Sequence, residues 1–237
     1  MKNTEQVASE LSCMTQNDCK SFKTCLKKRN EEDFVKSSIE RIDKSFLTGD
    51  YGSIIMDCSA FSSKKVIGEK CRKILPEVYT SLIRRARLMR DKRKRNYVIC
   101  SYLNNIKWNF ITDTTKDEGK TVCREMELAE SVALGIEDAK RMAKSKRTSL
   151  SYQCDDYNLI KFDKLGTPWA LLQKKKLIDA CFRIHGKAIL KHLIVDQKIT
   201  CSYKLTKIYR KLKKYNIHDK EIDNLIEQIQ LSCPGNN

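Results

Sequence analysis

A dense block of positive charge between Arg84 and Arg95 constrains the fold more than any other feature of the sequence. The block holds one acid, Asp91, and eight cations: Arg84, Arg85, Arg87, Arg90, Lys92, Arg93, Lys94 and Arg95. Because burying unpaired charges is costly, we expect this block to lie at the surface. Apolar residues at steps of three and four flank it, over 78–89 and 98–110. The pattern predicts one long helix, or two abutting helices, with buried ends and a basic middle.

Residues that break helices are rare in this chain. Its 237 residues include only eight Gly and three Pro, while 41% are hydrophobic and 32% are charged. A disordered chain would usually hold fewer aromatic and branched residues, so we expect a folded protein. The predicted fold is all-α, a multi-helix bundle in two helical units, with a short strand near residues 157–162.

We expect four segments along the chain. Residues 1–33 lack a readable apolar period, which predicts an N-terminal arm that is either weakly ordered or a loosely docked helix. Residues 34–147 form a helical domain with the basic helix at its centre, and residues 148–166 form a linker. Residues 167–237 form a C-terminal helical unit with a basic amphipathic helix.

Capping residues predict where several helices begin and end. Gly49 suits the C-terminus of an early helix, and Pro76 suits the first turn of the long basic helix. The polar run 112–119 predicts a loop, with Asp117 as the N-cap of the helix that follows. In the C-terminal unit, residues that favour N-caps precede three apolar-periodic stretches, at Thr167, Ser202 and Asp219.

The second basic stretch lies on a predicted helix over residues 202–215. At about 100° per residue, its apolar side chains fall within roughly one quarter of the circumference; these are Leu205, Ile208, Leu212 and Tyr215. Cations cover the neighbouring surface, at Lys204, Lys207, Arg210, Lys211, Lys213 and Lys214. This helix is therefore able to pack against a core and present positive charge at once.

The net charge of +17 is divided into two positive blocks. Residues 1–110 carry +10, residues 111–165 carry −1 and residues 166–237 carry +8. Surfaces of this kind bind polyanions, because each phosphate contact releases counterions. The competing interpretation of both blocks is an ordinary solvated helix face, which needs no ligand.

We expect a nucleic-acid-binding accessory protein that contacts phosphates through these two surfaces. The 202–215 helix has no Asn, Gln or Arg near its start for reading bases, while Tyr203, Tyr209 and Tyr215 lie beside its lysines. Stacking on such tyrosines favours RNA over DNA. The alternative is a helical interaction subunit, for example of replication or transcription machinery, that docks on an acidic protein surface.

No catalytic or metal-binding motif is found in the sequence. It has three His, no glycine-rich phosphate loop, no nucleophile elbow and no paired-carboxylate motif, so we expect neither an enzyme nor a cofactor. The series Cys181, His185, His192 and Cys201 has wider spacing than structural zinc sites use. We therefore expect no metal there.

The cysteines and the N-terminus bear on location. The 11 Cys are scattered singly from Cys13 to Cys233, and their odd number makes a poor disulfide framework. The start lacks an apolar signal core, and no run reaches the roughly 18 apolar residues of a membrane span. We expect reduced thiols and a cytoplasmic or nuclear, not secreted, protein. Lys92 to Arg95 matches a nuclear import signal, and the composition suits a small viral accessory protein.

Overall fold

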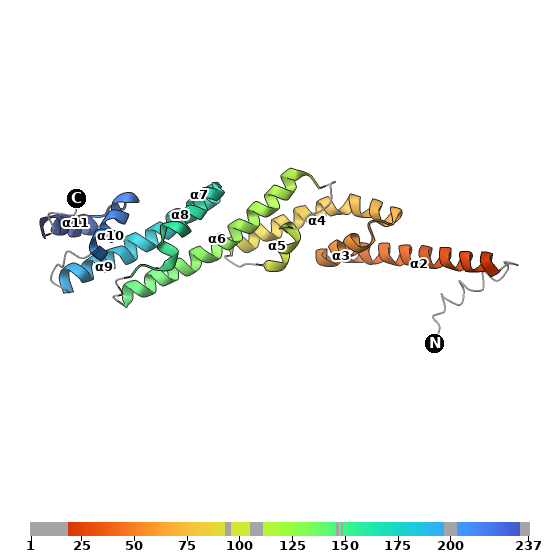
Figure 1. The fold of residues 1–237 in the computed structure, drawn as a ribbon, viewed down its shortest axis with the longest axis horizontal. Helices are drawn as coiled ribbons and strands as arrows, with labels where there is room; N and C mark the ends of the chain where they lie inside the picture. Colours follow the sequence, from red (N-terminus) through yellow and green to blue (C-terminus); the bar gives the residue numbers. More distant parts are fainter. Residues whose placement is uncertain are drawn as a thin grey trace. The chain divides into compact units, whose positions relative to one another are not determined.

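The computed structural model describes residues 19–92, 96–104, 111–145, 147, 149–196 and 203–232. Throughout these residues every regular element is helical and no strand occurs, so the predicted all-α class is confirmed (Figure 1). The chain divides into two compact units. The described residues of Met1–Arg84 and Ser101–Gly119 belong to the first, and those of Arg85–Cys100 and Lys120–Asn237 to the second. None of the helices in the described part is long and apolar enough to span a membrane.

The first unit is built on α2 (Cys19–Thr48), α3 (Tyr51–Phe61) and the larger part of α4 (Lys65–Asp91). Gly49 follows α2 with a φ of 70°, a left-handed conformation that glycine adopts without strain, as the sequence predicts. The described part of the arm expected at 1–33 is helical from Cys19 onward, in agreement with the alternative of a docked helix. The prediction for Pro76 is wrong, because Pro76 lies inside α4, which already begins at Lys65.

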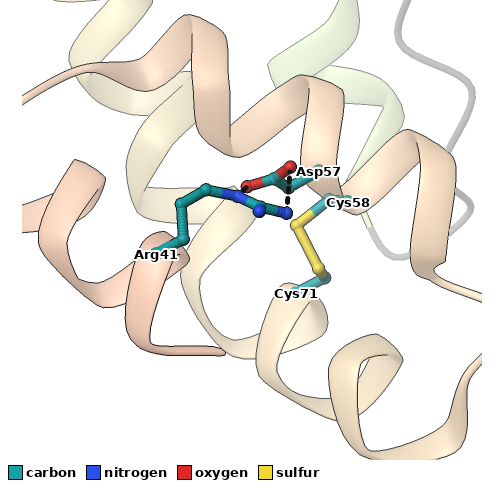
Figure 2. The surroundings of a disulfide bond; sticks show 4 residues. All are labelled: Arg41, Asp57, Cys58 and Cys71. Atoms are coloured by element: carbon teal, nitrogen blue, oxygen red, sulfur yellow. Dashed lines mark hydrogen bonds and ion pairs between the residues drawn. A yellow bond between two sulfur atoms is a disulfide. The ribbon is translucent and has the colours of Figure 1, made fainter. Parts of the chain in front are cut away.

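A disulfide and an ion pair connect α2, α3 and α4 in this unit (Figure 2). Cys58 of α3 bonds to Cys71 of α4, and both are buried. Beside it, Arg41 of α2 donates from Nε to Asp57 Oδ2 at 2.7 Å and from Nη2 to Oδ1 at 2.9 Å. This two-pronged geometry is the strong form of an arginine–carboxylate contact, so it fixes α2 against α3.

The second unit contains the C-terminal end of α4, the first part of α5 (Tyr97–Asn104) and most of α6 (Asp113–Lys144), followed by all later helices. These are η1 (Tyr152–Cys154), α7 (Asp156–Leu165), α8 (Pro168–Ile178), π-helical η2 (Asp179–Gly186), α9 (Lys187–Lys191), π-helical η3 (His192–Asp196), α10 (Tyr203–Lys214) and α11 (Lys220–Ser232). One apolar core joins α6 to α11 through residues such as Val132, Phe162, Leu190 and Ile222.

The predicted strand near 157–162 is replaced by a helix, and the stretch predicted as a linker contains η1 and α7. Residues 156–165 form α7, whose Leu159 and Phe162 are buried in the core. A short apolar run does not distinguish a strand from a buried helix, which explains the error. The next helix start is as predicted: the Thr167 hydroxyl accepts from Ala170 N at 3.2 Å, and Pro168 occupies the first turn of α8.

The polar run 112–119 is also helical, contrary to the prediction of a loop. Helix α6 begins at Asp113, and the Thr112 hydroxyl accepts from Thr115 N at 3.2 Å. Thr112 therefore fills the capping role that the sequence assigned to Asp117. Polar side chains suit these turns because several of them lie exposed at the surface.

The expectation of reduced thiols is wrong for several cysteines. Besides Cys58–Cys71, disulfides join Cys100 of α5 (Tyr97–Asn104) to Cys123 of α6, and Cys154 of η1 to Cys181 of η2. Cys25 also takes part in a disulfide. The partners of the three described pairs are 13, 23 and 27 residues apart. Single cysteines on separate helices give no local signal of such pairing.

We predict that replacing both Cys58 and Cys71 with Ser lowers the free energy of unfolding by about 3 kcal/mol, because the loop that the bond closes gains freedom in the unfolded chain. Chemical denaturation of the wild type and the variant, each with and without reductant, measures this effect. The variant should lose less stability than the wild type on reduction. Free thiols throughout the oxidised wild type, found by mass spectrometry of unreduced peptides, would contradict the prediction.

Candidate nucleic-acid interface

Helix α10 has one face in the core and one in solvent. Leu205, Ile208 and Leu212 are buried, as their spacing predicts. At its C-terminal end the Tyr215 ring stacks on Phe182 of η2, with centroids 5.1 Å apart. The burial of these side chains holds α10 in a fixed rotation about its own axis, which decides what the opposite face presents.

We define the α10 basic face as Lys207, Arg210, Lys213 and Lys214. The first three are exposed, and their side chains make no ion pair or hydrogen bond with any other described residue. Tyr203 lies one turn before Lys207 and is 78% exposed. Residues 203, 207, 210 and 214 are spaced by four, three and four, so they form one stripe along the helix. The side chain of Lys204, also predicted to bind, lies outside the described residues.

A carboxylate anchors the other edge of α10. Asp156, the first residue of α7, accepts from Lys214 Nζ at 2.9 Å and from the Tyr215 hydroxyl at 2.5 Å, and it also pairs with Lys211. The Lys211 side chain is 15% exposed, whereas that of Lys214 remains 54% exposed. Lys211 is therefore a structural cation, and its predicted role in binding a ligand is corrected. Lys214 both pairs with Asp156 and reaches solvent.

The protonation of these groups follows from the same contacts. Burial acts to raise the pKa of the Asp156 carboxyl, but hydrogen bonds from Lys211, Tyr215 and Lys214 lower it well below its usual range. Burial, followed by the hydrogen bond to the Asp156 anion, raises the pKa of the Tyr215 hydroxyl. The carboxylate therefore stays ionised, and the two lysines stay attached to it, at any ordinary pH.

The described cations of the basic block 84–95 differ in their exposure to solvent. Arg84, which belongs to the first unit, is exposed, and so are Arg85, Arg87 and Lys92 in the second. Arg90 instead points inward, with its side chain 15% exposed. It lies one turn after the buried Ala86 and so shares the apolar face of α4. The predicted binding residues Arg93, Lys94 and Arg95 lie outside the described residues.

Arg90 is neutralised inside the second unit. Its guanidinium pairs with the buried Glu125 of α6, donates from Nε to Asp91 Oδ1 at 2.9 Å and lies 5.0 Å from the centre of the Trp169 ring. The Thr167 hydroxyl donates to Glu125 Oε1 at 2.5 Å. Burial acts to lower the pKa of Arg90, but its hydrogen bonds to Asp91 and Glu125 raise it overall. Arg90 therefore holds α4, α6 and α8 together, and its predicted role as a surface cation is corrected.

Sequence reasoning missed Glu125, although a signal exists. Val122, Ala129 and Val132 are buried on α6, and Glu125 lies among them at helical spacing. A carboxylate on an apolar face predicts a buried cation opposite it. The identity of that cation is not visible in the sequence, because Arg90 is 35 residues away.

The zinc-like series is not assembled as a metal site. Cys181 is bonded to Cys154, which removes its thiolate, and Cys201 lies outside the described residues. His185 is fully buried, with Nε2 3.1 Å from the Arg147 carbonyl oxygen and no hydrogen-bond partner for Nδ1 among the described residues. No group of three His, Cys, Asp or Glu suited to a metal occurs in the part of the chain that the structure describes.

Comparisons of the chain with protein-family models, with curated proteins and with solved structures found no match. No residue role is therefore transferred from another protein. The candidate interface depends on the geometry of α10 and of the exposed arginines on α4.

We predict that Arg90→Met lowers the free energy of unfolding by about 3–5 kcal/mol, because it leaves the Glu125 carboxylate buried without its partner. The double variant Arg90→Met with Glu125→Leu should recover most of this loss. Arg84→Met, at an exposed site on the same helix, is the matched control and should change stability by less than about 0.5 kcal/mol. Equal losses in the Arg90 and Arg84 variants would refute the assignment.

We also predict a pH-dependent stability that is due to His185. Burial lowers the pKa of this imidazole, and the hydrogen bond to Arg147 only partly opposes it. The unfolded chain therefore binds a proton first, so stability is fully present above about pH 6.5 and falls below it, by up to about 1.4 kcal/mol per pH unit. Denaturation curves between pH 5 and 8 should show this slope. It should diminish in His185→Gln and persist in the control His218→Gln, at an exposed site.

Proposed function

We propose that the protein binds nucleic acid, with RNA preferred over DNA, by contacting phosphates through the α10 basic face. Arg85 and Arg87 of α4 and the following Lys92, which are exposed in the second unit, are proposed as a second contact surface, and Arg84 is proposed as a separate contact on the first unit. The proposal is based on one observation: α10 is fixed to the core by one face and exposes cations on the other. Its apolar side chains and Lys211 are fixed in the second unit, while Lys207, Arg210 and Lys213 project without a carboxylate partner among the described residues.

The dimensions of the α10 basic face suit a phosphate chain. With a rise of about 1.5 Å per residue, Lys207 and Lys214 are about 10 Å apart along the helix axis. Successive phosphates of one strand advance about 3.4 Å along a duplex, so the face spans about three of them. Because core contacts hold the helix, its backbone does not have to be ordered when the ligand binds, so only the cationic side chains lose conformational freedom.

The preference for RNA is supported by Tyr203. Of the three tyrosines near the lysines, Tyr215 stacks on Phe182 and donates to Asp156, and the Tyr209 hydroxyl accepts from Gln230 at 3.3 Å. Tyr203 alone of these three is mainly exposed, and it shares the stripe of Lys207 and Arg210. Its ring is able to stack on an unpaired base while the cations contact phosphates on either side of it.

The location of the protein is part of the proposal. The sequence predicts the cytoplasm or nucleus, but disulfides persist mainly in secreted proteins, in the bacterial periplasm and on cell or virion surfaces. The pairs Cys58–Cys71, Cys100–Cys123 and Cys154–Cys181 therefore favour an oxidising compartment. Thiol titration of the protein taken from its native source distinguishes the two locations.

We predict that Lys207→Glu with Arg210→Glu lowers the affinity for a single-stranded RNA oligonucleotide at least about tenfold, because two phosphate contacts are lost. The slope of log Kd against log salt concentration should also fall in magnitude by about 1.4. Fluorescence anisotropy at four salt concentrations measures both. Lys211 and Lys214 are left unchanged because both bind Asp156, and reversing their charge would loosen α10.

The matched control is Lys140→Glu with Lys144→Glu on α6, two exposed lysines without a partner among the described residues. This control removes the same net charge, so an equal loss of affinity in both variants would mean that only the overall charge matters. Single-stranded DNA and RNA and DNA duplexes of matching sequence test the preference for RNA. A wild-type protein with no salt-sensitive binding to any of them would overturn the proposal and favour docking on an acidic protein.

A further inference from the structure

A groove on the second unit is lined by residues that the α10 basic face does not use. Its walls come from α7, α8, η2 and the residues that follow α10, and it encloses about 700 Å³. Pockets that hold small ligands usually enclose roughly 300–1,000 Å³. The groove therefore has the size of a ligand site, and its lining combines two kinds of side chain.

Apolar side chains form one part of the lining. Leu171 and Leu172 of α8 are 46% and 51% exposed, and Ile178 and the buried Ile217 extend the same wall. The core does not require the two leucines, because α8 buries its opposite face through Ala170 and Leu177. Large apolar side chains that gather in a concave surface usually mark a contact with an apolar ligand.

Lysines whose charge is not neutralised form the other part of the groove lining. Lys174 donates to Asp163 Oδ1 at 2.7 Å, and Arg183 donates to Asp179 Oδ1 at 2.5 Å, so both acids of the groove are already paired. Lys175 and Lys176 are exposed, and their side chains have no partner among the described residues. The groove therefore keeps two ammonium groups beside its leucines, and the lysine stems add to the apolar wall.

We infer that this groove binds a free fatty acid, with the acyl chain against Leu171, Leu172 and Ile178 and the carboxylate at Lys175 and Lys176. The wall offers apolar surface that a phosphate chain does not need, and the lysines complement a negative head group. A protein partner of ordinary affinity would cover about 800 Å² on each side, more than the face of one short helix supplies. The inference does not depend on RNA binding.

The test uses the full-length oxidised protein and isothermal titration calorimetry with laurate below its micelle concentration. We expect one laurate per chain. Dodecanol, which has the tail without the charge, should bind up to about fivefold more weakly, since one exposed ion pair contributes up to about 1 kcal/mol. Acetate, which has the charge without the tail, should not bind measurably. Binding of dodecanol or acetate as tight as that of laurate would overturn the inference.

Variants separate the groove from the rest of the surface. Lys175→Glu with Lys176→Glu should weaken laurate binding at least about tenfold, because the carboxylate meets like charge. Leu171→Ser with Leu172→Ser should weaken it by a similar factor. The matched control Lys140→Glu with Lys144→Glu should leave it unchanged, and so should Lys207→Glu with Arg210→Glu. Circular dichroism checks that each variant is folded.

Three further outcomes would overturn the inference. The first is unchanged laurate binding in both groove variants. The second is binding only to vesicles of mixed neutral and anionic phospholipid, which would make the groove a membrane contact. The third is displacement of laurate by the single-stranded RNA oligonucleotide, which would make the groove part of the nucleic-acid interface. Loss of RNA binding in the α10 variant with laurate binding intact would support two separate sites.

Discussion

The pairing of partly buried cations with carboxylates is the constraint that organises this structure. Among the described side chains, every lysine or arginine that is more than about two-thirds buried has a carboxylate partner. The pairs are Lys70–Asp43, Arg90–Glu125, Lys116–Asp113, Lys174–Asp163, Lys187–Glu221 and Lys211–Asp156. In a chain with a net charge of +17, the carboxylates have to lie beside the partly buried cations, because an unpaired cation in a low dielectric is costly.

The same constraint leaves particular cations available. Because Asp156 is occupied by Lys211, Lys214 and Tyr215, it does not neutralise Lys207 or Arg210. Because Asp163 and Asp179 are occupied by Lys174 and Arg183, they do not neutralise Lys175 or Lys176. The cations that remain differ in their surroundings: those on α10 share a stripe with an exposed tyrosine, and those on α8 lie beside exposed leucines. These surroundings separate the proposed RNA contact from the proposed fatty-acid site.

The described disulfides join helical segments to one another and do not involve α10. Each of the three described bonds joins two helical segments, and none of its cysteines belongs to α10. Isolated helices are marginally stable in water, and most of their stability comes from packing against neighbours. A covalent link between neighbours reduces the freedom of the unfolded chain and so supports a core of modest size.

The sequence by itself determined what depends on local geometry. The all-α class, the inward and outward faces of α10, the left-handed Gly49 and the caps at Thr167 and Asp219 follow from residues within a few positions of one another. Only the tertiary structure decided which cations are used internally and which cysteines are paired. Arg90 meets Glu125 across 35 residues, and Lys214 meets Asp156 across 58. Such partners come together only when helices far apart in the chain pack side by side, so no local pattern of residues predicts them.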